Sequence, residues 1–271
     1  SAPPVSTSLT AEQIKVVADA ATLAVSQANL GESEDLISLL PKIIEGAQGS
    51  LKDLGLSSSE TIKVVQIVVF SMTQSLNGRS ENLPSSSADS DSTPLETAIS
   101  KVAKTSIGQL DEAGLSASDV ASASSSLVGT MVGSLDDGGL QASDLSGAVE
   151  KITSGATSAL GDVSGVSVND LASVIEGITS GATGALDDIS VSGYSSDNLS
   201  SLVEKVTSGS TSALGGIQVA GFSADNLSAM VEKVTSGATK ALGSISMSGY
   251  DAADLSGMME KVTAGATASL G

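Results

Sequence analysis

The chain has 271 residues, of which 40% are hydrophobic but only 1% aromatic, and its net charge is −19. This hydrophobic content excludes wholesale disorder and predicts a folded protein whose core is built from aliphatic and small side chains. The negative charge repels nucleic-acid backbones, so we expect no nucleic-acid partner. Because the chain contains no cysteine and no histidine, thiolate and imidazole metal sites, cysteine nucleophiles and histidine-dependent triads are excluded, and we expect no enzyme, cofactor or metal site.

Residues 1–76 predict an N-terminal block of about three helices. Its first residues, SAPPVSTS, are small, proline-rich and uncharged. Such a start is typical of mature exported proteins, so we expect secretion or a cell-surface location. The most apolar run, IKVVQIVVFSM at 62–72, contains Lys63 and Gln66 and is too short to span a bilayer, so it predicts a buried helix.

Residues 77–94, NGRSENLPSSSADSDSTP, are rich in serine, proline and acidic residues. This composition predicts a linker or long loop between the N-terminal block and the rest of the chain. Asp89 and Asp91 carry carboxylates that suit calcium. An acidic pair without the remainder of a calcium-binding loop favours a plain solvated linker instead.

Residues 95–271 contain a regular repeat, which is clearest in its second half. Five similar blocks, of which EKVTSGATKALG is one, begin at glutamates spaced by 26, 28, 28 and 28 residues. Weaker copies with a similar spacing of apolar residues occur upstream, including Leu36 to Leu51 and Ile14 to Leu30. The five glutamates are Glu150, Glu176, Glu204, Glu232 and Glu260.

The connectors between repeats carry helix start and stop signals. Glycine follows the last apolar residue as a C-cap, and serine with an acidic or amide residue up to three positions later forms an N-cap. Late connectors also contain ISV, IQV or ISM, which predict a loop in preference to a very short strand. We therefore expect an all-α fold of tandem single-helix repeats, about 25–28 residues each, stacked as antiparallel helical hairpins in an α-solenoid or extended helical array.

Each of the five clear repeats contains the motif TSGAT, or a close variant of this motif, inside its predicted helix. A helix-interior glycine costs about 1 kcal/mol relative to alanine, so a repeated glycine predicts a repeated close contact. A helical wheel places the threonines on one flank of the apolar stripe and the glycines on the other. We expect the glycine flank of one helix to receive the threonine flank of the next repeat, with each threonine hydroxyl bonded to a carbonyl of its own helix. The glycines are Gly155, Gly181, Gly209, Gly237 and Gly265, and the threonine pairs are Thr153/Thr157, Thr179/Thr183, Thr207/Thr211, Thr235/Thr239 and Thr263/Thr267.

Two alternative interpretations of the repeat stay open at this point. If the threonine flank faced solvent, the recurring threonines would form a flat water-ordering array, as in some ice-binding proteins. The concave face of a solenoid would alternatively bind a peptide, glycan or apolar ligand, which a groove of exposed Leu, Val and Met side chains would favour. Glu and Lys within each repeat are adjacent and point about 100° apart, so they indicate a solvated face in preference to an acid/base pair.

The last repeat, 255–270, keeps the full apolar, glycine and threonine pattern. Terminal repeats usually carry a polar cap, so this repeat predicts either a longer array or self-association through an uncapped C-terminal repeat. The sequence thus favours a non-catalytic, exported structural or surface scaffold, with another copy or a protein or surface partner.

Overall fold

The computed structural model describes residues 34–52, 56–77, 92–136, 140, 142–163, 166–189, 195–217, 223–245 and 251–268. Within these ranges the secondary structure is helical, with no strand. This confirms the predicted all-α helical-repeat fold. The helices are α2 (Glu34–Lys52), α3 (Ser58–Asn77), α4 (Pro94–Gly108), α5 (Ala117–Gly133), α6 (Ala142–Ser158), α7 (Val168–Gly184), α8 (Ser196–Leu214), α9 (Ala224–Leu242) and α10 (Ala252–Ala268), with short 3₁₀ turns η3 (Ala159–Gly161) and η4 (Ala185–Asp188) after α6 and α7.

The predicted serine N-caps form at the starts of α5, α7, α8 and α9, and the predicted glycine C-caps form after α8 and α9. Ser195 starts α8: its side chain accepts a hydrogen bond from the backbone of Asn198, whose side chain accepts from the backbone of Ser195 in return. Reciprocal capping of this kind satisfies two backbone donors that a helix start leaves unpaired. Gly215 and Gly243 are the C-caps of α8 and α9, with φ of −64° and −66°, so these glycines end the helices without a left-handed conformation.

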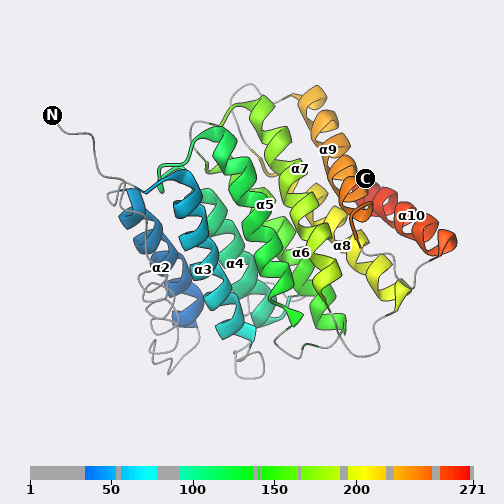
Figure 1. Cartoon of the computed structure of the whole chain (residues 1–271), viewed down its shortest axis with the longest axis horizontal. Helices are drawn as coiled ribbons and strands as arrows, with labels where there is room; N and C mark the ends of the chain where they lie inside the picture. The colour runs from blue at the N-terminus through cyan, green and yellow to red at the C-terminus, as the bar shows by residue number, and fades with distance from the viewer. Residues whose placement is uncertain are drawn as a thin grey trace.

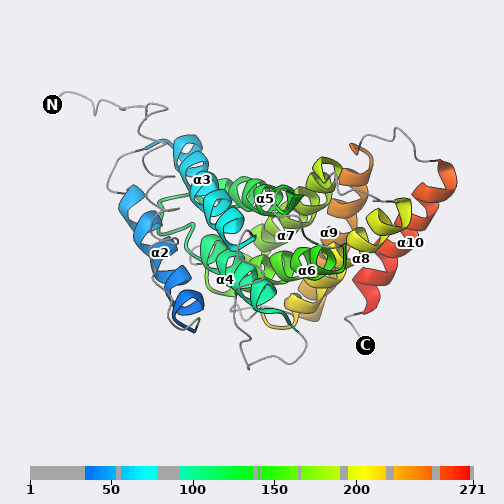
Figure 2. The ribbon, with the colours of Figure 1, turned by 90° about the horizontal axis from the view of Figure 1, so that it is seen from below.

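Alternate helices make the most extensive contacts, and the helices therefore form two layers. One layer contains α2, α4, α6, α8 and α10, and the other contains α3, α5, α7 and α9 (Figure 1). Seen from below, one layer lies over the other and its helices cross those beneath (Figure 2). Consecutive helices belong to different layers and run in opposite directions, so each consecutive pair is a hairpin.

Helices of the same layer run parallel to one another. At the start of α3 the hydroxyl of Ser58 donates to Asp119 at the start of α5, at 2.9 Å. At the other end, the Asn77 amide of α3 donates to the carbonyls of Ser134 and Leu135 after α5, at 3.3 and 3.2 Å. Start meets start and end meets end, so a helix and its second successor have the same direction.

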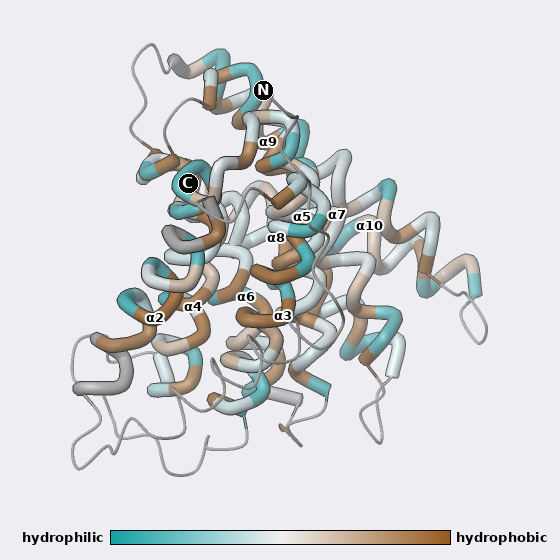
Figure 3. Tube along the Cα trace, turned by 60° about the vertical axis from the view of Figure 1, so that its left-hand side comes forward, coloured by the Kyte–Doolittle hydropathy of each residue, from teal (hydrophilic) through white to brown (hydrophobic). Residues whose placement is uncertain are grey.

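A single cluster of buried aliphatic side chains runs from Leu40 to Val262. Figure 3 shows hydrophobic stretches recurring along the helices between hydrophilic turns, as amphipathic helices require. Ile189, Ile217 and Ile245, which begin the ISV, IQV and ISM segments, are buried. The remainder of those segments, the unit at 14–30 and residues 78–91 of the linker lie outside the described residues, so the domain boundaries stay predictions. In the part of the chain that the structure describes, no helix has the length and apolarity needed to cross a membrane.

Candidate functional site

Five glycines allow the helices of one layer to approach very closely. A Cβ added at any of them would lie within 2.6 Å of a backbone carbonyl oxygen two helices earlier in the chain. Side chains do not tolerate such a distance, so glycine is required by the approach itself. The pairs are Gly155 with Ser100, Gly181 with Ser125, Gly209 with Glu150, Gly237 with Glu176, and Gly265 with Glu204.

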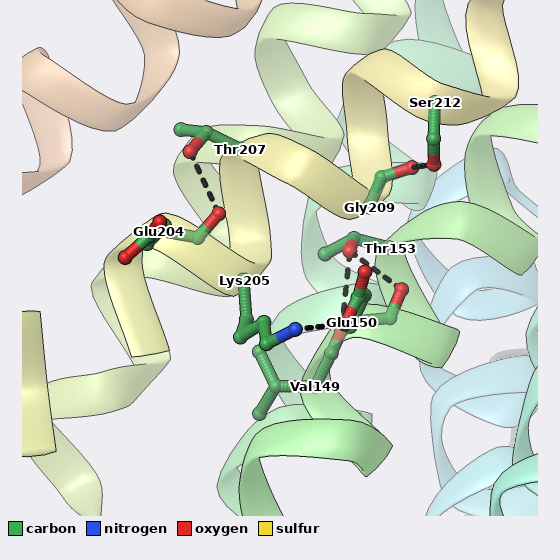
Figure 4. A network of polar contacts seen from close by, with 8 residues as sticks. All are labelled: Val149, Glu150, Thr153, Glu204, Lys205, Thr207, Gly209 and Ser212. Carbon is green, nitrogen blue, oxygen red and sulfur yellow. Dashed lines mark hydrogen bonds and ion pairs between the residues drawn. The ribbon is translucent and has the colours of Figure 1, made fainter. Parts of the chain in front are cut away.

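Threonine lies opposite three of these glycines. An added Cβ at Gly209 or Gly265 would contact the hydroxyl of Thr153 or Thr207, and one at Gly237 would lie 3.2 Å from the Cβ of Thr179. These threonines are fully buried, and each hydroxyl donates to the carbonyl four residues earlier in its own helix at 3.0–3.1 Å. The hydroxyl is thereby satisfied without a partner on the facing helix. We call each glycine, with the threonine and the carbonyl that face it, a joint (Figure 4).

The joints connect different helices from those that the sequence predicted. We expected the glycine of one helix to meet the threonine of the next repeat, but each joint instead connects a helix with its second successor. The physical reason is the hairpin connection. The next repeat reverses direction and enters the other layer, and only the second successor presents its glycine flank in the same direction.

The second threonine of each pair lies outside the joint. We expected both threonines of α8, Thr207 and Thr211, to pack against the glycine and alanine flank of another helix. An added Cβ at Gly265 instead has its nearest atoms on Glu204, Thr207 and Ser208, and none of these belongs to Thr211. Thr211 is only 2% exposed, so it is packed inside the stack although it is not among the nearest neighbours of Gly265. Thr211 lies one turn beyond Thr207, about 6 Å farther along the helix.

The hydroxyls of the second threonines also differ in their hydrogen bonds. The Thr211 hydroxyl donates to the Thr207 carbonyl at 2.8 Å, as expected. The buried hydroxyls of Thr157 and Thr183 have no hydrogen-bond partner among the described residues, so the expected bond to a carbonyl of their own helix is wrong for these two. Burying a hydroxyl without a partner costs about 1–3 kcal/mol. Thr157 and Thr183 therefore stabilise the stack through their methyl groups and not through their hydroxyls.

Ion pairs accompany the joints on the outer side. The ammonium of Lys205 lies 2.6 Å from Glu150, that of Lys233 lies 2.7 Å from Glu176, and that of Lys261 lies 2.6 Å from Glu204. The hydrogen bond and charge of the facing glutamate raise the pKa of Lys233 and of Lys261 above the ordinary lysine value, so both ammonium groups stay charged at neutral pH. The sequence indicated only a solvated face for these residues. Their recurrence at fixed positions in each repeat was the available signal for pairing.

Polar contacts also connect helix starts within a layer. Asp119 accepts from Ser116, the N-cap of its own helix, and from Ser58 of α3, and these hydrogen bonds lower the pKa of its carboxyl group. Asp254 at the start of α10 shows the same arrangement. Its pKa is lowered by the backbone of Asp251 and then by the hydroxyl of Ser196 in α8. Asp119 and Asp254 therefore stay ionised at neutral pH, and their hydrogen bonds connect the starts of alternate helices.

The threonines of α9 and α10 are placed differently from those of the inner helices. Thr239, Thr263 and Thr267 are exposed and Thr235 is half-buried, whereas the six threonines at the same positions in α6, α7 and α8 are at most 2% exposed. The sequence predicted helix packing for all of them. That prediction is wrong for these four within the described chain, because neither α9 nor α10 has a second successor there to cover it.

Other residues on the same flank are uncovered as well. Leu255 and Met259 of α10 are 36% and 40% exposed, whereas Leu199 and Val203, their counterparts in α8, are 2% and 0% exposed. Glu260 is exposed and makes no ion pair with another described residue. On α9, Glu232, Thr235 and Thr239 line a shallow hollow. We call these residues the open edge: Glu232, Thr235 and Thr239 on α9, with Leu255, Met259, Glu260, Thr263 and Thr267 on α10.

The burial pattern bears on both alternative interpretations of the repeat. Six of the ten repeat threonines are buried, so the threonines do not form a continuous water-ordering array. Among the described residues the exposed large hydrophobic side chains are Phe70, Leu255 and Met259. Leu255 and Met259 lie on α10, whereas Phe70 lies on α3, where it lines an open hollow together with Ile67 and Thr130. Within the same ranges, no group of three or more acidic side chains is arranged to hold a metal ion.

Comparison with known proteins gives a distant likeness to a solved structure. No protein-family model and no curated protein matches the chain. One similar solved structure is described as "Computational Design of Self-Assembling Cyclic Protein Homooligomers". The two chains share 12% sequence identity with a TM-score of 0.37, over 96% of this chain and 95% of that chain.

Proposed function

We propose that this protein is a non-catalytic, exported structural scaffold that self-associates through its stacked helical repeats. The observation that carries the proposal is the open edge, which presents the threonine and glutamate half of a joint without a glycine half upon it. This surface suits the docking of a helix, because inside the chain the same threonine and glutamate positions are covered by helices that carry Gly209, Gly237 and Gly265.

The exposed side chains at the open edge support an interaction role. Leu255 and Met259 occupy positions that the inner repeats bury, and exposed apolar side chains next to polar ones are typical of interaction surfaces. Covering them gains about 25 cal/mol per Å² of buried apolar surface. The remaining residues of the edge add complementary charge and shape, which give a docking surface its specificity.

The absence of cysteine and histidine from the sequence supports a non-catalytic role. The charge of −19 favours a protein that stays soluble and avoids nucleic acid and anionic membranes. In this proposal the repeats determine the length of the scaffold and the open edge determines what it joins.

Sedimentation analysis over a wide concentration range tests the proposal. We expect the average mass of the purified chain to rise with concentration, because open-edge contacts follow mass action. We also expect particles that lengthen as they grow, since stacking adds material along one axis, and solution scattering measures this directly. A chain that remains monomeric at every concentration would contradict self-association.

A further inference from the structure

We infer that the open edge of α10 receives helix α2 of a second copy, so that copies of the chain join head to tail. This inference rests on the proposed function, since it names the partner for the same surface. The occupied joints inside the chain define what such a partner must carry. Its helix needs a lysine to meet the glutamate and, four residues later, a glycine to meet the threonine, as Lys205 and Gly209 of α8 do.

Helix α2 carries this pair on an accessible flank. Lys42 and Gly46 have the same four-residue spacing, and both are exposed. No atom lies within 4 Å of the position that a Cβ on Gly46 would occupy. At the filled joints, by contrast, a backbone carbonyl lies within 2.6 Å of the corresponding position.

The flank of α2 that carries Lys42 and Gly46 faces away from α4. The side of α2 toward α4 is identified by Gln48, whose amide donates to the Ser106 carbonyl at 3.0 Å, and by Ile44, which is fully buried. In the repeat alignment, Ile44 and Gln48 occupy the two threonine positions, which in the inner helices face the second successor. Lys42 and Gly46 consequently occupy the opposite flank. In α8 and α10 that flank contacts the helix two positions earlier in the chain.

The two edges are complementary in both charge and shape. In the filled joint of α10 itself, Lys261 pairs with Glu204 while Gly265 receives Thr207. The docked copies would repeat this arrangement, with Lys42 against Glu260 and Gly46 against Thr263. The same parallel geometry then continues from one chain into the next without a new type of contact.

Charge disfavours the alternative in which two open edges meet. Such a contact would bring glutamates toward glutamates and would place threonine against threonine, with no edge glycine to admit close approach. Like charges brought together across an interface cost free energy and select against that arrangement. A head-to-tail contact joins two different surfaces of the same protein. When the rotation between successive copies does not close a ring, repetition of this contact produces an open filament.

Charge-reversal variants of the full chain test the inference by sedimentation. We expect Lys42→Glu and Glu260→Lys each to weaken self-association on the order of tenfold, because each turns an attractive pair into a repulsive one. The double variant Lys42→Glu/Glu260→Lys restores the opposite charges and is expected to recover most of the lost association. Lys101→Glu makes the same charge change on an exposed position of α4 and is expected to associate as the native chain does. Circular dichroism and thermal unfolding establish that each variant remains folded.

Two results would overturn the inference while leaving self-association standing. One is a Lys42→Glu variant that associates normally while Glu260→Lys does not, which would place another surface on the open edge. The other is a double variant that stays as weak as the single ones. A native chain that never associates is a different result, since it contradicts the proposed function along with this inference.

Discussion

Gly209→Ala is expected to lower the free energy of unfolding by about 1–3 kcal/mol, the usual cost of overpacking a tight interior. Alanine normally stabilises a helix relative to glycine by about 1 kcal/mol, so the expected sign is opposite to that of helix propensity. The reason is steric: the new Cβ would lie 2.5 Å from the carbonyl oxygen of Glu150 and in contact with the hydroxyl of Thr153. Backbone cannot move aside as a flexible side chain can, so helices α6 and α8 must separate.

Gly257→Ala provides the matched control for this substitution. Gly257 lies inside α10, and no atom lies within 4 Å of the position of an added Cβ. The same chemical change there is expected to raise stability by about 0.5–1 kcal/mol through helix propensity alone. Chemical denaturation followed by circular dichroism measures both variants. Equal changes of the same sign would show that the joint glycine has no special role.

Thr207→Leu and Thr263→Leu are expected to have different consequences although both residues follow a Glu-Lys-Val triplet. Thr207 is fully buried against Gly265, so the larger side chain is expected to cost about 1–3 kcal/mol of folding stability. Thr263 is exposed, so leucine there is expected to change stability by less than about 0.5 kcal/mol. It is nevertheless expected to abolish self-association, because it fills the space that the incoming glycine backbone needs.

Denaturation and sedimentation of the two leucine variants separate folding from docking. A strongly destabilised Thr263→Leu would show that this edge is covered within a single chain. A stable Thr263→Leu that associates as the native chain does would show that association uses another surface. Either result contradicts the role that we assign to the open edge.

The sequence alone was sufficient to predict the helices and the way they begin and end. The recurrence of glutamate at 26 or 28 residues indicated the repeat, and the serine caps follow from local chemistry that a few neighbouring residues determine. The helical wheel also identified the two flanks that form the joint. The caps and the flanks both depend on positions within one helix, and the order of residues specifies these directly.

The sequence did not specify which helix covers which flank. Thr207 and Thr263 have nearly the same local sequence, yet one is buried and the other exposed, because burial depends on how many helices follow in the stack. The pairing of Lys205 with Glu150 was missed for a similar reason. Its two members belong to repeats that are separated by an entire helix in the other layer, and a wheel of one helix contains no information about that neighbour.

The separate places of Thr207 and Thr211 were equally hidden from the sequence. Both lie on the flank that the wheel identified, and both are buried. Thr207 is the one of the two that lies among the nearest neighbours of Gly265 in α10. The position along the axis at which two helices make contact is determined by their packing and not by the residues of either helix alone.

A double-mutant cycle between Thr207 and Gly265 tests most directly whether joints connect alternate helices. The cycle combines Thr207→Ala with Gly265→Ala, and a parallel cycle combines Thr235→Ala on α9 with the same glycine variant. We predict a coupling free energy of at least about 0.5 kcal/mol for the first pair, since the two residues touch, and additivity to within about 0.5 kcal/mol for the second. Coupling between Thr235 and Gly265, with none between Thr207 and Gly265, would contradict the alternate-helix stack.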